Sequence, residues 1–452
     1  MAKSEVAVLG AGFSATATII NLLEHLPPEK SVAVAGAGGG FGLGTAYSTH
    51  DDGHRLNVSA ARMSLYADRP DHLIDWLGRE RHPYGPEDFV PRRLYGTYIQ
   101  DSLSKSLQQQ DNRARVTFLG AEAIDCERLD CETQIFSLGN GENIEARHTV
   151  FCLGGTPAGL PIAQEAIDVA ARRYISVNAW GDNWLERIGS QDTIFLLGSG
   201  LTTVDQVLSL KRQGHEGQIH ILSRHGLLPQ PHHVPRSHPI EPILTPGAHA
   251  LSEMLHILRQ KAKDAPDWRA VVDGLRPVTQ TLWQKLSPEE RRRFFRHANA
   301  WWSVHRHRMA PEIAAAFHDM QASGQVHVHA GWLQAIRDYQ GQARIAYLDR
   351  HTGTLKQISA AHFVNCTGIE KCSISKVPLL KKMSAKAMIA SDPMGLGLAI
   401  SPQSEIISPD GTTINNAYAM GPMAVGQFFE IFAVPDIRVQ ARKVAEKIAQ
   451  AA

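Results

Sequence analysis

The chain opens on the stretch Val6-Ala7-Val8-Leu9-Gly10-Ala11-Gly12-Phe13-Ser14-Ala15, and a similar stretch recurs as Ile194-Phe195-Leu196-Leu197-Gly198-Ser199-Gly200-Leu201-Thr202-Thr203. In both, a short apolar strand leads into a Gly-x-Gly turn and then into a helical pattern. In a dinucleotide-binding fold, the first glycine makes the tight turn, and the second lets the backbone approach the pyrophosphate at the helix N-terminus. Two such turns in one chain predict two nucleotide sites, as in an enzyme that passes hydride from a nicotinamide to a bound flavin.

The residues that follow the first turn indicate how its nucleotide is held. The third motif position packs helix on strand and needs a small side chain, which Ala15 supplies; Thr203 in the second turn is larger and matches less well. About 20 residues beyond such a turn, a carboxylate usually binds the ribose hydroxyls, but here the position holds Ala35 and Gly36. The first site must hold its ribose by backbone or other groups, or bind it with reduced affinity.

After the second turn, the next predicted strand ends at Ser223-Arg224-His225. A cation without an acid favours a 2′-phosphate, and therefore NADPH over NADH. The alternative interpretation is that Arg224 is a solvated arginine at the end of a strand.

Apolar periodicity along the chain predicts an α/β fold with two Rossmann-like dinucleotide-binding domains and a helical insert. Helices are predicted from Gly12 to Leu26, over 72–80 and 94–107, from the second turn to about Leu210, and over most of 251–322. Strands are predicted near 6–9, 32–34, 116–119, 135–138, 150–153, 194–197, 219–222 and within 326–365. A loop is predicted over 229–247, where prolines and glycines cluster.

Bulk composition excludes several classes of protein. A chain of 452 residues is long for one core, and its formal net charge of +1 gives no global field to recruit nucleic acid or a membrane surface. No apolar stretch reaches the roughly 18 residues of a membrane span. The five scattered cysteines, Cys126, Cys131, Cys152, Cys366 and Cys372, indicate a reducing compartment. We therefore expect a cytoplasmic protein with a small-molecule substrate, and leave its oligomeric state open.

Collinear segments over nearly the whole chain carry a family resemblance. They are Gly44-Thr45-Ala46-Tyr47-Ser48, His54 to Ser64, Asp68-Arg69-Pro70, Trp76-Leu77, Phe89 to Tyr98, Ser223 to Pro229, Val304 to Glu312, Asn365 to Gly368, Gly395 to Leu398, and Gly421-Pro422 through Gly426-Gln427-Phe428-Phe429-Glu430 to Arg438. Together they resemble a large bacterial family of FAD/NAD(P)-binding flavoproteins, related to the class B-like flavin monooxygenases with two dinucleotide domains.

The resemblance implies a discontinuous FAD domain, with an N-terminal part at 1–165 and a C-terminal part at 351–452. Between them it implies an NAD(P)H domain at 166–350 that carries the helical insert at about 250–322. It also implies that Asn57 to Ser64 line the flavin ring and that the Gly421 region caps the ribityl chain and ring. The candidate cofactor-binding residues are Gly10, Gly12, Phe13, Ser14, Ala15, Tyr47, Asn57, Met63, Ser64, Gly154, Gly198, Gly200, Leu201, Thr202, Ser223, Arg224, Gly368, Gly421 and Gln427.

Three other groups of residues invite a chemical interpretation. Cys126 and Cys131 have the spacing of a redox loop but lie far beyond the first nucleotide unit, so unreactive thiols are favoured. Cys366 is favoured as a small buried residue rather than a nucleophile. The stretch 291–308 is rich in arginine, histidine and tryptophan, and could either face a cofactor or anionic substrate or form a solvated, paired helix face. No metal site is expected, and no single residue is singled out as catalytic.

The sequence thus predicts an oxidoreductase that binds FAD and NADPH, and a monooxygenase acting on a small organic substrate through the reduced flavin. One alternative is a flavin-dependent dehydrogenase or reductase without oxygen insertion. Another is a nucleotide-sensing binding protein, because the ribose carboxylate is missing from the first site.

Overall fold

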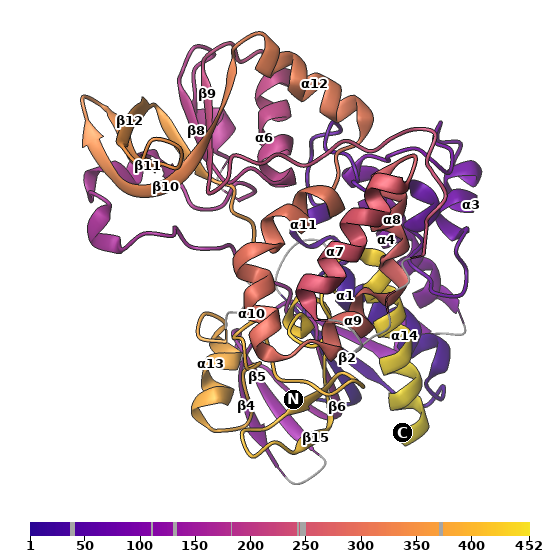
Figure 1. The fold of residues 1–452 in the computed structure, drawn as a ribbon. Helices are drawn as coiled ribbons and strands as arrows, with labels where there is room; N and C mark the ends of the chain where they lie inside the picture. The colour runs from indigo at the N-terminus through magenta and orange to yellow at the C-terminus, as the bar shows by residue number, and fades with distance from the viewer. Residues whose placement is uncertain are drawn as a thin grey trace.

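The computed structural model describes residues 1–36, 41–109, 112–129, 133–181, 183–241, 244, 250–369 and 374–452. Two sheets form two lobes, and both chain termini lie in the lobe of the first sheet (Figure 1). The glycine-rich stretch 37–40 and the cysteines at 131 and 372 lie outside the described residues.

The first sheet has the strand order β14-β15-β6-β1-β2-β3, with β4 and β5 continuing from β6. Its strands are β1 (Ala2–Leu9), β2 (Val32–Ala35), β3 (Val116–Leu119), β4 (Ala123–Arg128), β5 (Gln134–Leu138), β6 (Asn143–Phe151), β14 (Glu405–Ile407) and β15 (Thr413–Ala419). From β15 to β3 the pairing is parallel. Along β1 the side chains alternate, so Val6 and Val8 pack on one face and Ala7 and Leu9 on the other.

The second sheet has the order β12-β11-β10-β9-β8-β13-β7. Its strands are β7 (Ile175–Ser176), β8 (Ile194–Leu197), β9 (Ile219–Ser223), β10 (Val326–Tyr339), β11 (Gln342–Asp349), β12 (Leu355–Ala360) and β13 (His362–Asn365). Because β13 pairs in parallel with both β8 and β7, the second sheet includes residues as far along the chain as Asn365. The boundary placed at 350 from the sequence therefore falls short of the second sheet's last strand.

Helices cover both sheets. They are α1 (Phe13–His25), α2 (Gly44–Tyr47), α3 (His72–Arg79), α4 (Arg92–Gln108), α5 (Asn112–Arg115), α6 (Leu201–Arg212), α7 (Leu251–Asp264), α8 (Trp268–Gly274), α9 (Thr279–Lys285), α10 (Pro288–His297), α11 (Asn299–Arg306), α12 (Pro311–Ala322), α13 (Pro378–Ala385) and α14 (Val434–Ala451). In the first lobe, α1 and α14 pack together against the β1 face that carries Val6 and Val8. Within the described residues, no helix has both the length and the apolar character that a membrane crossing requires.

The predicted helical insert is divided between the lobes. Helices α7, α9 and α10 share a core with the first sheet, in which the Trp283 ring stacks on Phe429 at 4.7 Å. Helix α12 instead packs beside α6 in the second lobe, where Phe317 and Met320 are buried (Figure 1). The insert is thus not confined to the nicotinamide domain to which the sequence analysis assigned it.

Candidate functional site

The first glycine turn is shaped by a close approach of backbone. Gly10 has φ +134°, and a Cβ there would lie 2.1 Å from the Cys152 carbonyl oxygen at the end of β6. Helix α1 begins after Gly12, which provides no side-chain cap. The first N–H groups of α1 therefore have no capping side chain, which is the arrangement that binds phosphate oxygens.

Two distant segments meet this helix end. A Cβ on Gly12 would lie 3.8 Å from Gly44 Cα, and a Cβ on Gly421 would lie 2.6 Å from Ser14 Oγ. The Tyr47 ring lies edge-on to Phe13, with centroids 6.3 Å apart. The first turn, the Gly44 segment and the Gly421 segment thus lie together at the start of α1 and form one cradle. Thr16 Oγ1 is buried nearby and has no hydrogen-bond partner among the described residues. These features fit a bound FAD pyrophosphate.

Steric contacts explain why this chain has no carboxylate at the position that usually binds the ribose. A Cβ on Gly36 would lie 2.7 Å from Ala11 Cβ and 3.0 Å from the Ala11 nitrogen. Any side chain at Gly36 would therefore displace the first glycine turn. In this chain, the strand end and the turn are packed too closely for an acid at that position.

The segment expected to line the flavin is half-buried at one end and buried at the other. Asn57 is half-buried, and its carbonyl accepts a hydrogen bond from His232 Nε2 at 3.0 Å. Met63 is buried, and its carbonyl accepts from the Tyr95 hydroxyl at 2.8 Å. Ser59 Oγ is buried without a partner. The Asn57 end of the segment is therefore the part that can contact a ligand.

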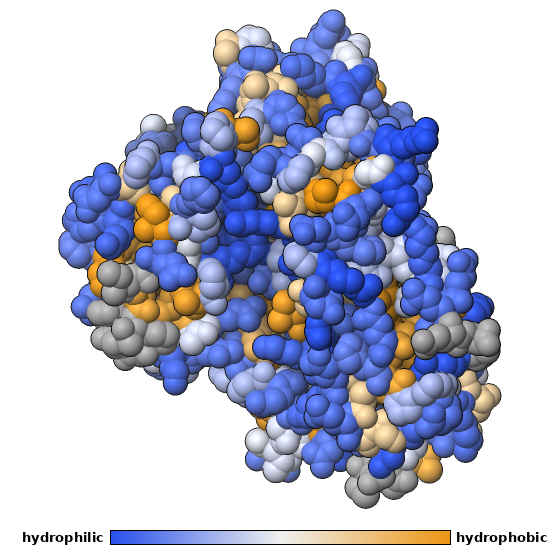
Figure 2. All heavy atoms as spheres, turned by 90° about the vertical axis from the view of Figure 1, so that its right-hand side faces the viewer, coloured by the Kyte–Doolittle hydropathy of each residue, from blue (hydrophilic) through white to orange (hydrophobic). Residues whose placement is uncertain are grey.

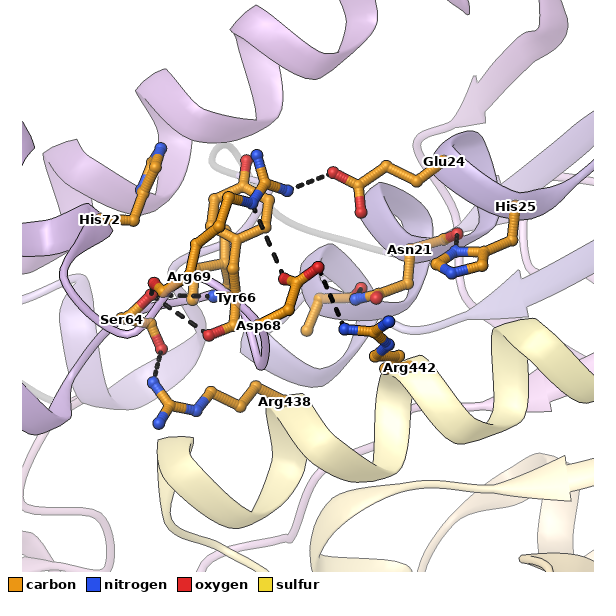
Figure 3. A network of polar contacts seen from close by, with 12 residues as sticks. Asn21, Glu24, His25, Ser64, Tyr66, Asp68, Arg69, His72, Arg438 and Arg442 are labelled. Atoms are coloured by element: carbon orange, nitrogen blue, oxygen red, sulfur yellow. Dashed lines mark hydrogen bonds and ion pairs between the residues drawn. The ribbon is translucent and has the colours of Figure 1, made fainter.

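Ser64 instead has a structural position. Its hydroxyl donates to the Arg69 carbonyl at 2.6 Å, and its own carbonyl accepts from Arg438 Nη1 at 2.7 Å (Figure 3). The side chain is fully buried in this network, which joins the 64–69 loop to α14. The structure therefore shows an internal role for Ser64, which the sequence analysis placed among the cofactor-binding residues.

The second turn repeats the geometry of the first. Gly198 has φ +105°, and a Cβ there would lie 2.7 Å from the Cys366 carbonyl oxygen. Gly200 precedes α6 without a side-chain cap, and a Cβ on it would meet no atom within 4 Å. Thr203, oversized for the motif, is accommodated because its hydroxyl donates to the Gly198 carbonyl at 2.8 Å. Leu201 and Thr202 are half-buried at the helix start.

The residues after β9 lie at the end of the strand where a dinucleotide-binding fold contacts the ribose of its nucleotide. Ser223 Oγ accepts a hydrogen bond from the Gly226 nitrogen at 3.0 Å, which shapes the turn. Arg224 is exposed, and no ion pair or hydrogen bond joins its side chain to any other residue among those described. Its guanidinium is therefore accessible to a phosphate, although solvation alone would also explain its exposure.

The remaining predicted residues lie near the connections between parts. Gly154 and Gly368, with φ +68° and +90°, belong to two of the segments that cross between the lobes, and the Gly368 carbonyl accepts from the Ala158 nitrogen at 3.0 Å. Gln427 is half-buried, and its carbonyl accepts from Gln284 of α9 at 3.5 Å. These contacts place Gly154 and Gly368 in segments that cross between the lobes, and Gln427 next to helix α9 of the insert.

The two lobes are joined through α6. Arg92 and Asp205 form an ion pair at 3.3 Å, with side-chain exposures of 15% and 7%. His54 Nε2 donates to Ser209 Oγ at 2.8 Å, and this hydroxyl donates to Asp51 at 2.7 Å. Burial raises the pKa of Asp205 despite Arg92, and burial lowers the pKa of His54. The helix that starts at the second turn is thus fixed to the flavin lobe by buried polar groups.

The structure also assembles a cleft that sequence reasoning did not identify. It is lined by Asn57, Val58, Ser59, Arg62, Glu87, Phe89, His232, His233, Val234, Arg236, Asp273, Arg276, Arg306 and Arg308. Burial, followed by the charge of Arg308, lowers the pKa of His232 to about 4. Sequence signals pointed to two parts of it, the segment Asn57 to Ser64 and the basic stretch 291–308, whereas Arg236 and Arg276 come from unrelated segments.

That basic stretch separates into different roles. Arg291 donates to three backbone carbonyls, on Trp283, Gln284 and Gly426. Residues 292, 293 and 296 are exposed. Arg306 and Arg308 alone among its arginines line the cleft.

The described cysteines are unsuited to redox chemistry. Cys126, Cys152 and Cys366 are buried, and burial raises the pKa of each to about 12. A thiolate is the reactive form, so these thiols are inert at neutral pH.

Comparisons with known proteins agree with this geometry. Residues 7–156 match a family described as FAD-NAD(P)-binding. A search of curated protein sequences finds no match. Among solved structures, an ornithine N-hydroxylase from Kutzneria sp. 744 is 12% identical with a TM-score of 0.67, covering 99% of each chain. L-lysine 6-monooxygenase from Pseudomonas syringae is 16% identical with the same TM-score and coverage.

A thioredoxin reductase from T. acidophilum also shares the fold, at 10% identity and a TM-score of 0.55, covering 100% of this chain and 99% of that chain. At these identities the structural likeness shows the fold alone. The two-sheet fold predicted from the two glycine turns is thereby confirmed. The family match covers residues 7–156, which contain the first turn and the segment expected to line a flavin.

Proposed function

We propose that this chain is an NADPH-dependent, FAD-containing oxidoreductase, and that it acts as a monooxygenase on a small organic substrate. One observation carries the proposal. Two uncapped helix N-termini, each behind a Gly-x-Gly turn, lie at the carboxyl ends of strands in two sheets that a buried interface joins. Such paired sites suit an enzyme that brings two dinucleotides together.

The residues of the chain would bind and orient the cofactors. The start of α1 would hold the FAD pyrophosphate, with Gly44 and Gly421 closing the cradle. The start of α6 would hold the NADPH pyrophosphate, and Arg224 the 2′-phosphate. Bound FAD supplies the hydride acceptor and the electrons for later oxygen chemistry.

His232 lies beside the segment expected to line the flavin. Its Nε2 must carry hydrogen because its partner is the Asn57 carbonyl oxygen. Its low pKa keeps the ring neutral at physiological pH, so Nδ1 retains a lone pair. The ring would therefore accept a hydrogen bond through Nδ1, and would act neither as a cation nor as a strong base.

A visible spectrum of the purified chain with FAD tests the proposal. We expect NADPH to bleach the flavin band without oxygen, and air to restore it. An oxygenated product formed in step with NADPH consumption would identify a monooxygenase. Turnover without such a product, and without dependence on oxygen, would identify the reductase alternative.

The third alternative, a nucleotide-sensing binding protein, has a separate signature. It predicts that the chain binds a nucleotide but holds no flavin even after FAD is added. The steric contact at Gly36 weakens this alternative, because it explains the missing carboxylate without a loss of the cradle. A disulfide reductase finds no support in Cys126, Cys152 or Cys366, which are buried and protonated.

A further inference from the structure

Five guanidinium groups converge on the cleft between the flavin-lining segment and the helical insert. They belong to Arg62, Arg236, Arg276, Arg306 and Arg308, which four separate parts of the chain supply. The face of the molecule in Figure 2 is mostly hydrophilic, with hydrophobic residues in small separate patches, so it offers no broad apolar docking surface. The chemistry of the cleft is instead that of a positively charged site.

Three carboxylates neutralise only part of this charge, two of them buried (Asp273 and Glu430) and one half-buried (Asp436). The pairs are Arg236 with Asp273 (2.7 Å), Arg308 with Asp273, Arg276 with Asp436 (3.2 Å) and Arg306 with Glu430 (3.0 Å). The one other carboxylate in the lining, Glu87, is exposed at the rim. Two guanidinium groups share Asp273, so the cleft carries excess positive charge.

Arg62 is the group without a partner. No ion pair or hydrogen bond joins its side chain to another residue in the described part of the chain, although it is half-buried. Burial, and then the charges of Arg236 and Arg276, lower its pKa to about 10. A partly desolvated cation beside other cations is unfavourable unless an anion accompanies it.

We propose that this cleft binds an anionic group of the substrate, a carboxylate or a phosphate, and that Arg62 contacts it directly. The inference rests on the proposed function, because the cleft is called a substrate site on the ground that Asn57 to Ser59 belong to the segment that the resemblance places beside the flavin. The planar fork of an arginine matches two oxygens of either group. An ammonium group would meet the same excess charge and be repelled.

The other source of an anion would be the nicotinamide dinucleotide. Under the proposed function, its phosphates would have donors in the second lobe, at the start of α6 and at Arg224. Arg62 lies in the first lobe, within the stretch 57–62 that lines the cleft. The substrate is therefore the better source, and the two sources are experimentally separable.

The test is calorimetric titration of the full chain with inorganic phosphate, succinate and 1,4-diaminobutane, and separately with NADP⁺. The variants are Arg62→Gln, Arg62→Lys and Arg224→Gln. The matched control is Arg296→Gln, which removes an exposed arginine of α10 that does not line the cleft. Circular dichroism checks that each variant is folded, and anaerobic NADPH reduction of added FAD is recorded for all.

We expect the wild-type chain to bind phosphate or succinate and not the diamine. Because a hydrogen bond to a charged group is lost, Arg62→Gln should weaken anion binding about tenfold or more, and Arg62→Lys less. Arg296→Gln should match wild type, and Arg224→Gln should weaken NADP⁺ binding alone.

Three results would overturn the inference: no anion binding by wild type, equal anion binding by wild type and Arg62→Gln, or a loss in Arg62→Gln of NADP⁺ binding instead of anion binding. The last result would assign the cleft to the dinucleotide. Absence of flavin reduction by NADPH in the wild-type chain would instead count against the proposed function. Anion titration can be read without flavin, so the two failures are distinguishable.

Discussion

Introducing a glutamate at Gly36 is a sharp test of how the first nucleotide site is built. A rule based on sequence alone would expect Gly36→Glu to supply the missing ribose ligand and tighten FAD binding. The structure leads to the opposite expectation. A Cβ at Gly36 would lie 2.7 Å from Ala11 Cβ and 3.0 Å from the Gly10 carbonyl carbon, so the turn must move.

The size of the effect follows from the shortness of these contacts. Forcing an extra carbon into a packed site costs about 1–3 kcal/mol. The atoms displaced are those of the Gly10-Ala11-Gly12 turn that would approach the pyrophosphate. If the cost falls on FAD binding, the dissociation constant rises about 5-fold to 150-fold.

Titration of the flavin-free chain with FAD, followed by flavin fluorescence, measures this change. Gly36→Ala should weaken binding similarly, because the Cβ and not the charge is responsible. Removing the closest atom in an Ala11→Gly/Gly36→Glu double variant should restore part of the affinity. Gly120→Ala is a matched control at the end of β3, since a Cβ there meets nothing within 4 Å. Tighter FAD binding by Gly36→Glu than by wild type would refute this reasoning.

Three further predictions concern the lobe interface, the insert and the nicotinamide site. Arg92→Met should lower the free energy of unfolding, measured with denaturant, by about 3–5 kcal/mol, because it removes the partner of the buried Asp205 carboxylate. Asp205→Asn should lower it less, because burial already disfavours the charge of Asp205. Burial opposes ionisation of Glu430, but Arg306 outweighs it and lowers the carboxyl pKa below its usual 4.5. The stability from Glu430 should therefore be complete above pH 4.5 and be lost as the pH falls through the lowered value, so Glu430→Gln should flatten the wild-type decline in unfolding midpoint at acidic pH. Arg224→Gln should raise the dissociation constant for NADPH about tenfold and leave that for NADH unchanged, as measured by titration.

Local signals predicted much of the architecture. The turns at Gly10 and Gly198 were recognisable because the alternation of strand, glycine and helix is confined to about ten residues. What the sequence did not reveal depends on pairing between distant segments. The strand His362–Asn365 follows an antiparallel hairpin, yet it pairs between β8 and β7, and only the folded sheet shows that the second lobe extends beyond residue 350.

The candidate site shows the same division between local and distant information. Ser64 and Asn57 lie in one short segment, but burial sends the Ser64 hydroxyl into the protein and leaves Asn57 at the cleft. No periodicity distinguishes the two, because the segment holds only one short 3-10 helix, Ala60–Arg62, between them. Its orientation is set by Arg438 from the opposite end of the chain.

The arginines show why charge counted along a sequence is a poor guide to a binding site. Within 291–308, the guanidinium of Arg291 donates hydrogen bonds to backbone carbonyls. Arg306 lines the cleft and forms an ion pair with Glu430. Arg62, with no basic neighbour in sequence, is the arginine of the cleft that no ion pair joins to a carboxylate among the described residues. A paired arginine mainly stabilises the fold, whereas an unpaired and half-buried arginine retains the capacity to bind an anion. The position of the uncompensated charge, and not the density of arginine, therefore identifies where a ligand would bind.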